Sequence, residues 1–172
     1  MSSKQGDLVL LENPMAQELL HSTIPARLAY VWDDGTPRVI PIWFHWDGTE
    51  IVLGSPVTAP KFNVLLDNSK VALTIDSNTW SYRTLLIRGI ARVQIVDGIV
   101  PEYAASAERY FGADQGHAWV EQVRAMSTHS GRIAIRPEWV GFLDFETRFP
   151  IAIERAMEAA AGAPVTSSHA SV

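Results

Sequence analysis

The sequence predicts a mainly β protein with flanking helices, built on one antiparallel sheet of six or seven strands. Three observations lead to this prediction. Apolar runs are separated by Asp-Gly pairs at 34–35 and 47–48, which is typical of tight hairpins. Residues 82–96 alternate with a period of two over an unusual length for a strand. Stretches with helical periodicity lie between the strand runs, so helices should flank the sheet.

The strand pattern suggests how the sheet is connected. Strands are expected at 26–32, 37–46, 50–55, 71–76, 82–96, 132–136 and 139–145. Because the first three are joined by short turns, a three-stranded meander is the simplest topology. The longest strand should bend at Gly89, since glycine within a strand often marks a bulge or a barrel corner. Pro137 is expected to separate the last two strands.

The helical pattern defines the covering elements and the domain limits. Helices are expected near residues 14–20, 60–67, 101–111, 117–126 and 154–161. Asn13 should cap the first helix, with Pro14 at its first position. The final residues are rich in Ala, Ser, Thr and Pro and lack apolar periodicity. We therefore expect one domain over residues 1–150 and a helical, mobile tail over residues 151–172.

Composition excludes several classes of protein. The 172 residues are 47% hydrophobic and 19% charged, as in an ordinary globular domain. A net charge of −5 with scattered basic residues argues against nucleic-acid binding. The absence of cysteine excludes disulfides, thiolate zinc sites and cysteine nucleophiles. No segment resembles a signal core or a membrane span of roughly 18 apolar residues. A cytoplasmic protein without membrane contact is expected.

Familiar catalytic motifs are missing. The sequence lacks the Gly-x-Ser-x-Gly elbow, a Walker loop and the Gly-x-Gly-x-x-Gly fingerprint. Its five histidines lack helical i, i+4 pairing or a matching acid, so no metal site is predicted. Two of the 19 acidic residues could converge into a glycosidase-type pair, although the sequence singles out none.

Residues 51–66 run from an apolar strand through a loop into a helix. Thr58 is expected to cap this helix and Pro60 to lie in its first turn, where a missing N–H costs nothing. Lys61 falls in the same turn, where a cation opposes the helix dipole. A phosphate held by Lys61 and free backbone N–H groups would remove this conflict. For this stretch alone, a solvated lysine on a surface helix is the favoured interpretation, because motifs this short often match by chance.

Several segments together resemble a known family. They are Arg27 to Tyr30, Pro37 to Phe44, Leu53-Gly54-Ser55, Pro60-Lys61-x-Asn63-x-Leu65, Val71 to Asp76 and Ile87-Arg88-Gly89-x-Ala91. Their order and spacing over residues 15–145 resemble the pyridoxamine 5'-phosphate oxidase-like split-barrel superfamily. That superfamily includes flavin- and deazaflavin-dependent oxidoreductases. The resemblance implies a split β-barrel and agrees with the phosphate interpretation of Lys61.

The resemblance also implies a cofactor site. Lys61 and the loop from Thr58 to Pro60 would hold the phosphate of FMN, with Arg38 nearby. The backbone of Val39, Ile40, Pro41 and Ile42 would run along the isoalloxazine ring, and Ser55 would lie close to it. The family often has Ser or Thr two residues before the lysine, whereas this chain has Ala59. One phosphate hydrogen bond would then be lost unless Thr58 replaces it.

Family members are homodimers with the cofactor at the subunit interface. The resemblance therefore implies that a second copy of this chain completes the site. Trp80 and Arg83 are the expected donors, together with Trp139 and the segment from Phe145 to Phe149.

The resemblance leaves three functions open. The first is an oxidoreductase that transfers a hydride between FMN and a small molecule. The second uses the deazaflavin F-420, for whose polyglutamyl tail Lys70, Arg83 and Arg92 are candidate partners. The third is a non-catalytic protein that binds flavin, deazaflavin or haem. The chain lacks the terminal Arg-x-His signature of the pyridoxal phosphate-forming oxidase, so pyridoxamine phosphate is not the expected substrate. Flavin chemistry needs no side-chain acid or base here, and no residue is predicted to be catalytic.

Overall fold

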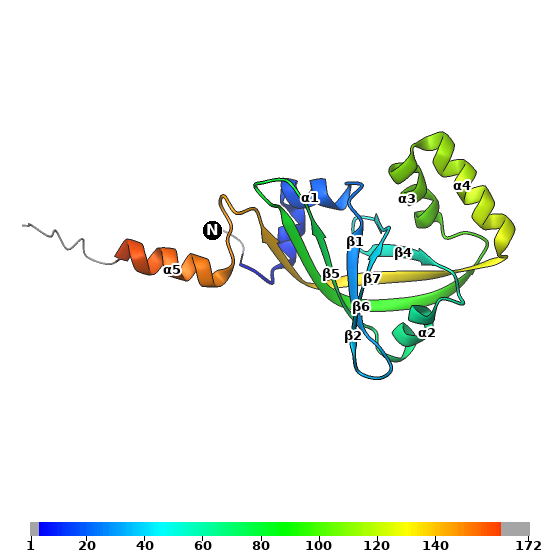
Figure 1. Ribbon diagram of the computed structural model, residues 1–172, viewed down its shortest axis with the longest axis horizontal. Coiled ribbons are helices and arrows are strands. Elements are labelled where there is room, and N and C mark those ends of the chain that lie inside the picture. Colours follow the sequence, from blue (N-terminus) through cyan, green and yellow to red (C-terminus); the bar gives the residue numbers. More distant parts are fainter. Residues whose placement is uncertain (1–3, 163–172) are drawn as a thin grey trace, which may run out of the picture.

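A computed structural model describes residues 4–162, and within them seven strands form one antiparallel sheet (Figure 1). The strands are β1 Ala26–Val31, β2 Pro37–Ile42, β3 His45–Trp46, β4 Ile51–Ser55, β5 Lys70–Asp76, β6 Thr84–Asp97 and β7 His129–Leu143. Their order across the sheet is β2-β1-β5-β6-β7-β4-β3. The mainly β fold predicted from the sequence is therefore confirmed.

The same residues form five α-helices and one short 3-10 helix. They are η1 Leu8–Glu12, α1 Pro14–Leu20, α2 Pro60–Asp67, α3 Pro101–Phe111, α4 Ala113–Met126 and α5 Ile151–Gly162. Asn13 caps α1 as expected, accepting a 2.9 Å hydrogen bond from the backbone N–H of Met15. Residues 4–162 contain no helix with the length and apolar character needed to cross a membrane.

The predicted three-stranded meander is wrong. Both Asp-Gly hairpins form, since β1 pairs with β2 and β3 pairs with β4. However, β2 and β3 lie at opposite edges of the sheet. Pro37 and Pro41 explain this difference, because residues without a backbone N–H suit an edge strand rather than the middle of a meander. The chain leaves β2 after Ile42 and crosses to the other edge.

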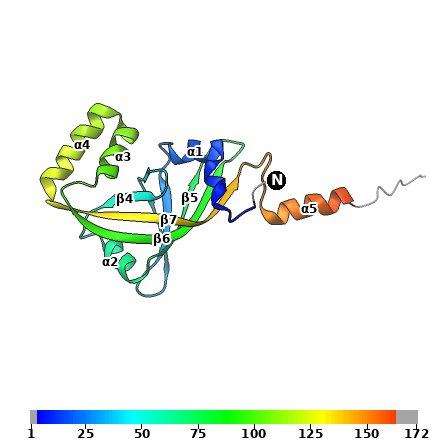
Figure 2. The ribbon, with the colours of Figure 1, turned by 180° about the vertical axis from the view of Figure 1, so that it is seen from behind.

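The last two predicted strands are one continuous strand, β7. Pro137 does not interrupt it, because the pairing of β6 with β7 shifts register between Arg88 and Gly89, and Pro137 lies opposite Gly89. At such an irregularity a strand tolerates the missing N–H. The bend predicted at Gly89 is confirmed. Figure 2 shows β6 and β7 running together along the length of the barrel.

One main core fills the barrel. Its largest fully buried side chains include Phe44, Phe142, Leu28, Ile51 and Ile87, which come from separate strands and from the link between β2 and β3. Burying apolar side chains of this size stabilises the fold by about 1.5–3 kcal/mol each. A smaller cluster of Val52, Val100 and Ala134 lies beneath α3 on the outer face of β4 and β7.

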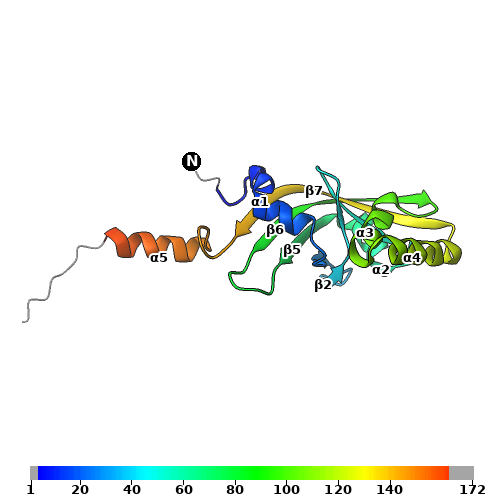
Figure 3. The ribbon, with the colours of Figure 1, turned by 90° about the horizontal axis from the view of Figure 1, so that it is seen from above.

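Helices α3 and α4 lie side by side near one end of the barrel, while α1 lies toward the other end (Figures 1 and 3). Gly54 in β4 allows α3 to approach closely, because a Cβ atom there would lie 2.6 Å from Cβ of Tyr103. Arg132 in β7 also anchors α3 through a 2.6 Å ion pair with Glu102. The β4 strand and α3 are thus held in direct contact.

Helix α5 projects away from the barrel (Figures 1 and 3). It covers the helix expected at 154–161, and its apolar residues Ile151, Ile153 and Met157 are exposed. The prediction of a mobile tail falls mostly on residues 163–172, which lie outside the described part of the chain. The division at residue 150 stays a prediction.

Candidate functional site

A cavity of about 840 Å³ lies between β2, β4, the start of α2 and the α3–α4 hairpin. Its volume falls within the range of about 300–1,000 Å³ typical of small-molecule sites. Apolar side chains dominate its walls. The lining residues are Pro25, Ile40, Pro41, Ile42, Trp43, Gly54, Ser55, Pro56, Val57, Thr58, Lys61, Val100, Tyr103, Trp119, Val123, Met126, Ser127, His129 and Ser130.

The start of α2 forms one part of the wall. Pro60 is the first helical residue as expected, but the N-cap is Ala59 rather than Thr58. Ala59 has no side-chain oxygen, so no side chain caps the first turn of the helix. Thr58 still lines the cavity, one residue before the cap. This helix start therefore presents an uncapped positive dipole end beside Lys61.

Lys61 is half-buried and lacks a counterion in the part of the chain that the structure describes. No acidic side chain in residues 4–162 forms an ion pair with it. Burial lowers the pKa of the Lys61 ammonium below its ordinary value of 10.5. A bound anion would raise that pKa again, because an opposite charge favours the protonated form. An anionic group such as phosphate thus fits the residues at this end of the cavity.

Six of the predicted cofactor residues line this one cavity. They are Ile40, Pro41, Ile42, Ser55, Thr58 and Lys61. β2 contributes the first three and β4 the fourth, and the last two lie at the start of α2. Ser55 is buried and donates a 3.2 Å hydrogen bond to the carbonyl of Pro56. Sequence positions far apart are therefore brought to one concave surface.

Five predicted residues are not among the cavity lining. Arg38 and Val39 are exposed on β2, where the guanidinium of Arg38 lies 5.1 Å from the Trp32 ring. Pro60 is exposed at the start of α2. Trp80 and Arg83 both lie in the loop between β5 and β6, and Arg83 pairs with Glu18. Trp80 and Arg83 were expected to reach the site from a second subunit, and this stays a prediction.

Sequence reasoning missed the wall formed by the α3–α4 hairpin. Trp119, Val123 and Met126 follow i, i+4, i+7 spacing on α4 and line the cavity. The helical periodicity of residues 117–126 predicts an inward face at Trp119, Val120 and Val123. Val120 is buried, whereas Trp119 and Val123 border the cavity. The spacing identifies a common face without revealing what covers it.

Aromatic rings stiffen this wall. Trp43 stacks on Tyr110 with ring centroids 5.0 Å apart and on Tyr103 at 6.1 Å. Phe111 meets Trp43 edge-on at 4.8 Å. The guanidinium of Arg109 donates a hydrogen bond to the carbonyl of Phe44, next to Trp43. These contacts hold α3 against the segment that links β2 to β3.

His129, the histidine that lines the cavity, is already partnered. His129 lies with Nε2 3.3 Å from a carboxylate oxygen of Asp97 and Nδ1 2.8 Å from the hydroxyl of Thr128. Burial and the nearby Arg109 lower the pKa of His45 on the neighbouring strand β3. No group of three metal-ligating side chains occurs in residues 4–162. Lys61 is thus a charged residue of the cavity lining that forms no ion pair within residues 4–162.

Comparison with protein families identifies the chain. The model of the pyridoxamine 5'-phosphate oxidase family matches residues 13–144, which include every strand of the sheet. The chain belongs to this family. The resemblance drawn from its sequence motifs is therefore confirmed. Among curated proteins, none matches the chain.

Solved structures agree with this family. An F420 reductase is 25% identical, with a TM-score of 0.54 over 74% of this chain and 95% of that one. A conserved hypothetical protein from Mycobacterium tuberculosis is 22% identical, with a TM-score of 0.63 over 84% and 91%. The haem storage protein HutZ from Vibrio cholerae is 15% identical, with a TM-score of 0.54 over 77% and 93%. The last two likenesses concern the fold, and the predicted split β-barrel is confirmed.

Proposed function

We propose that this chain is an oxidoreductase that binds FMN in the cavity, with the phosphate at Lys61. One observation carries the proposal: a half-buried lysine without a counterion stands beside an uncapped helix start. Both features favour an anion at the same point. The family of the chain supports a flavin-type ligand, and the cavity is large enough for one.

The chain's own residues would divide the work of binding. Lys61 and the first turn of α2 hold the phosphate, and the backbone of Ile40 to Ile42 orients the ring system along β2. Trp43 and Val123 exclude water from the opposite wall. When bound, the cofactor supplies hydride transfer, and the protein supplies anchoring, orientation and a dry site. We assign no catalytic side chain.

The deazaflavin F-420 is the second candidate cofactor. It is supported by the 25% identity to an F420 reductase, of which this chain covers 95%. The basic residues suggested for its acidic tail support it less well. Arg83 is paired with Glu18, and Arg92 forms hydrogen bonds of 2.8 and 2.9 Å with Glu50. Lys70 is exposed and has no ion-pair partner in residues 4–162.

Haem binding without turnover is the remaining alternative. His129 is the histidine among the lining residues that could ligate iron, and Tyr103 and Met126 are the other lining residues of types that ligate haem. Both ring nitrogens of His129 already lie near partners, so ligation would displace Asp97 or Thr128. This arrangement favours a flavin-type cofactor over haem.

We also propose that the protein works as a cytoplasmic homodimer and reduces or oxidises a small molecule. An aromatic cluster at the far end of the barrel supports a second copy as partner. Trp80 is 71% exposed and Tyr82 is 45% exposed, and both contact Phe145. The neighbouring helix α5 adds exposed Ile151 and Ile153. Apolar side chains gathered in this way are typical of an interface.

Mass spectrometry of the ligand released from the native protein tests the choice of cofactor. We expect FMN, with an absorbance spectrum that bleaches when a nicotinamide donor is added. Release of F-420 would support the second candidate instead. Release of haem, or a bound flavin that no nicotinamide donor or dithionite can reduce, would contradict the oxidoreductase proposal.

A further inference from the structure

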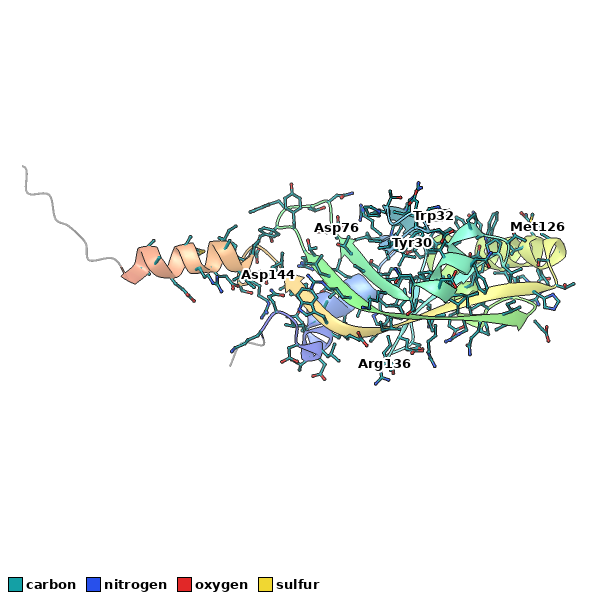
Figure 4. All side chains as sticks on the ribbon, turned by 90° about the horizontal axis from the view of Figure 1, so that it is seen from below. Tyr30, Trp32, Asp76, Met126, Arg136 and Asp144 are labelled. Atoms are coloured by element: carbon teal, nitrogen blue, oxygen red, sulfur yellow. The ribbon has the colours of Figure 1, made fainter. Side chains whose placement is uncertain are left out.

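The cavity has a second half whose chemistry differs from that of the lysine end. On α4, Gly116 and Val120 are buried, and a Cβ atom at Gly116 would lie 2.6 Å from Glu108 of α3. The missing side chain of Gly116 allows the two helices to pack closely together. The adjoining face of Trp119, Val123 and Met126 lines the cavity instead, and Met126 is 76% exposed at the end of α4 (Figure 4).

The wall of this half is rigid and aromatic. Trp43 stacks against Tyr103 and Tyr110 with interplanar angles of 27° and 18°. Trp119 is fixed from α4 by a 2.8 Å hydrogen bond from its indole Nε1 to the hydroxyl oxygen of Tyr103. Flat rings held in place favour a flat ligand, because stacking and edge contacts require little rearrangement.

One polar contact in this half remains available. The indole N–H of Trp119 can only donate, so the hydroxyl oxygen of Tyr103 is the acceptor, and the hydrogen of that hydroxyl has no acceptor within residues 4–162. The neighbouring hydroxyls are used, since Ser127 donates to the carbonyl of His129 at 2.7 Å and Ser130 to that of Gly98 at 2.6 Å. Tyr103 can therefore donate to an acceptor atom on a ligand.

This half of the cavity contains no unpaired charge. Its side chains are aromatic, aliphatic or hydroxyl-bearing, apart from His129, which faces Asp97. A charged ligand would lose hydration here without gaining a counterion. Lys61, by contrast, lies at the start of α2 and is taken by the cofactor phosphate under the proposed function.

We infer that Tyr103 and the cavity face of α4 form a substrate subsite for an uncharged, planar ring compound that carries a hydrogen-bond acceptor. Tyr103 donates to that acceptor, and Trp119 both fixes Tyr103 and contributes apolar surface. The inference rests on the proposed function for the role of its ligand as substrate. The subsite itself is defined by Tyr103 of α3 and the cavity face of α4, with Trp43 stacked on Tyr103.

Equilibrium binding to the cofactor-free full-length protein tests the subsite with two probes. Neutral 1,4-naphthoquinone carries acceptor oxygens, and naphthalene has the same rings without them. We expect Tyr103→Phe to weaken naphthoquinone binding roughly 2- to 10-fold, as for one neutral hydrogen bond, and to leave naphthalene binding unchanged. Trp119→Ala should weaken both, and Gln122→Ala, on the outer side of α4, should change neither.

A charge variant provides a second measurement that does not depend on Tyr103. Met126→Lys is tolerated at an exposed position and should shift preference from naphthoquinone toward its anionic 2-sulfonate. Ala125→Lys, the neighbouring exposed position outside the cavity, should not shift it. The subsite would be overturned if Met126→Lys and Ala125→Lys shifted the ligand preference equally. It would also be overturned if Tyr103→Phe lost naphthalene binding while keeping a native circular dichroism spectrum.

The two proposals can fail separately. Lys61→Ala should impair FMN binding and leave naphthoquinone binding by the apoprotein intact. Naphthoquinone binding with the expected Tyr103 dependence, in a protein that binds neither FMN nor F-420, would support the subsite and refute the cofactor proposal. FMN binding without any naphthoquinone binding would refute the subsite alone.

Discussion

At the scale of single residues, the start of α2 is unusual because it lacks the stabilising groups that helices commonly have there. Ala59 supplies no capping oxygen, and the first turn contains no acidic residue. Lys61 adds a partly desolvated positive charge to the positive end of the helix dipole. Each of these features lowers the stability of the protein when no ligand is bound. Together they are explained by an anion that binds at this point.

Ala59→Ser should relieve part of this cost. A serine at the N-cap accepts a hydrogen bond from the first turn, and this stabilises proteins by about 1 kcal/mol. Urea unfolding of the cofactor-free protein should show this increase. Ala125→Ser, the same substitution at an exposed position within α4, provides the matched control and should be neutral or slightly destabilising. Equal stability of the two variants would contradict the capping account of Ala59.

Asp144 makes folding sensitive to acid. It is buried after β7 (Figure 4) and accepts hydrogen bonds from the hydroxyl of Thr147 and from backbone N–H groups. Burial alone would raise the pKa of Asp144, but these bonds outweigh it and lower the pKa from 3.8 to about 2. The carboxylate therefore stabilises the fold above pH 3.8, and this contribution is lost as pH falls through 2.

Asp144→Asn should consequently lower the free energy of unfolding at pH 7 by on the order of 2 kcal/mol. The difference from the wild type should shrink between pH 4 and pH 2, the interval between the two pKa values. Chemical denaturation at several pH values measures it. Asp33→Asn, at an exposed turn position, should show little change at any pH. A deficit in Asp144→Asn that persists undiminished at pH 2 would contradict the assignment.

At the scale of elements, the long β6–β7 pair holds the barrel together, and its bend depends on Gly89. A Cβ atom at Gly89 would lie 2.1 Å from the backbone carbonyl oxygen of Arg136. Gly89→Val should therefore lower the free energy of unfolding by about 3 kcal/mol, at the upper end of the range for overpacking. Gln94→Val places the same side chain at an exposed position of β6 and should be nearly neutral. Matching melting temperatures for the two variants would contradict the predicted role of Gly89.

Local patterns predicted most elements, because turn glycines and strand periodicity act over a few residues. Asp34-Gly35 and Asp47-Gly48 correctly marked hairpins, and Gly89 correctly marked the bend. The order of the strands across the sheet does not follow from such local patterns. Pro37 and Pro41 contained the signal that β2 is an edge strand, but the short turns on either side favoured a meander. Pro137 was wrongly predicted to separate two strands. The strand tolerates this proline because it lies opposite Gly89 of β6, where the pairing shifts register, and the residues next to Pro137 do not reveal that.

At the scale of the whole molecule, the sequence predicted a cofactor site around Lys61, and that assignment stays a prediction. Ile40 to Ile42, Ser55 and Thr58 do share the cavity with Lys61. The α4 wall was not predicted as part of the site, because the periodicity of Trp119 and Val123 is the same for a core face and for a cavity face. Residues expected from a second subunit depend on an assembly that one chain does not contain.

The homodimer proposal predicts a mass in solution of about twice 19.0 kDa. Trp80→Ser should weaken the dimer, because Trp80 is 71% exposed within the aromatic cluster of Tyr82 and Phe145. Leu66→Ser removes an apolar side chain that is 60% exposed on α2, away from that cluster, and serves as the control. Sedimentation equilibrium distinguishes the two. A monomeric wild type, or equal dissociation constants for both variants, would refute an interface at this cluster.

The central claim is that Lys61 and the start of α2 recognise a cofactor phosphate, and the most direct test compares each cofactor with its phosphate-free form. The cofactor-free protein is titrated with FMN and riboflavin, and with F-420 and its phosphate-free chromophore. We predict that Lys61→Ala weakens binding of the phosphorylated form by about 1.5–3 kcal/mol, roughly 10- to 150-fold, and leaves the phosphate-free form unaffected. Lys70→Ala, an exposed lysine outside the cavity, should change neither. Equal losses for both forms, or none for either, would contradict the phosphate site.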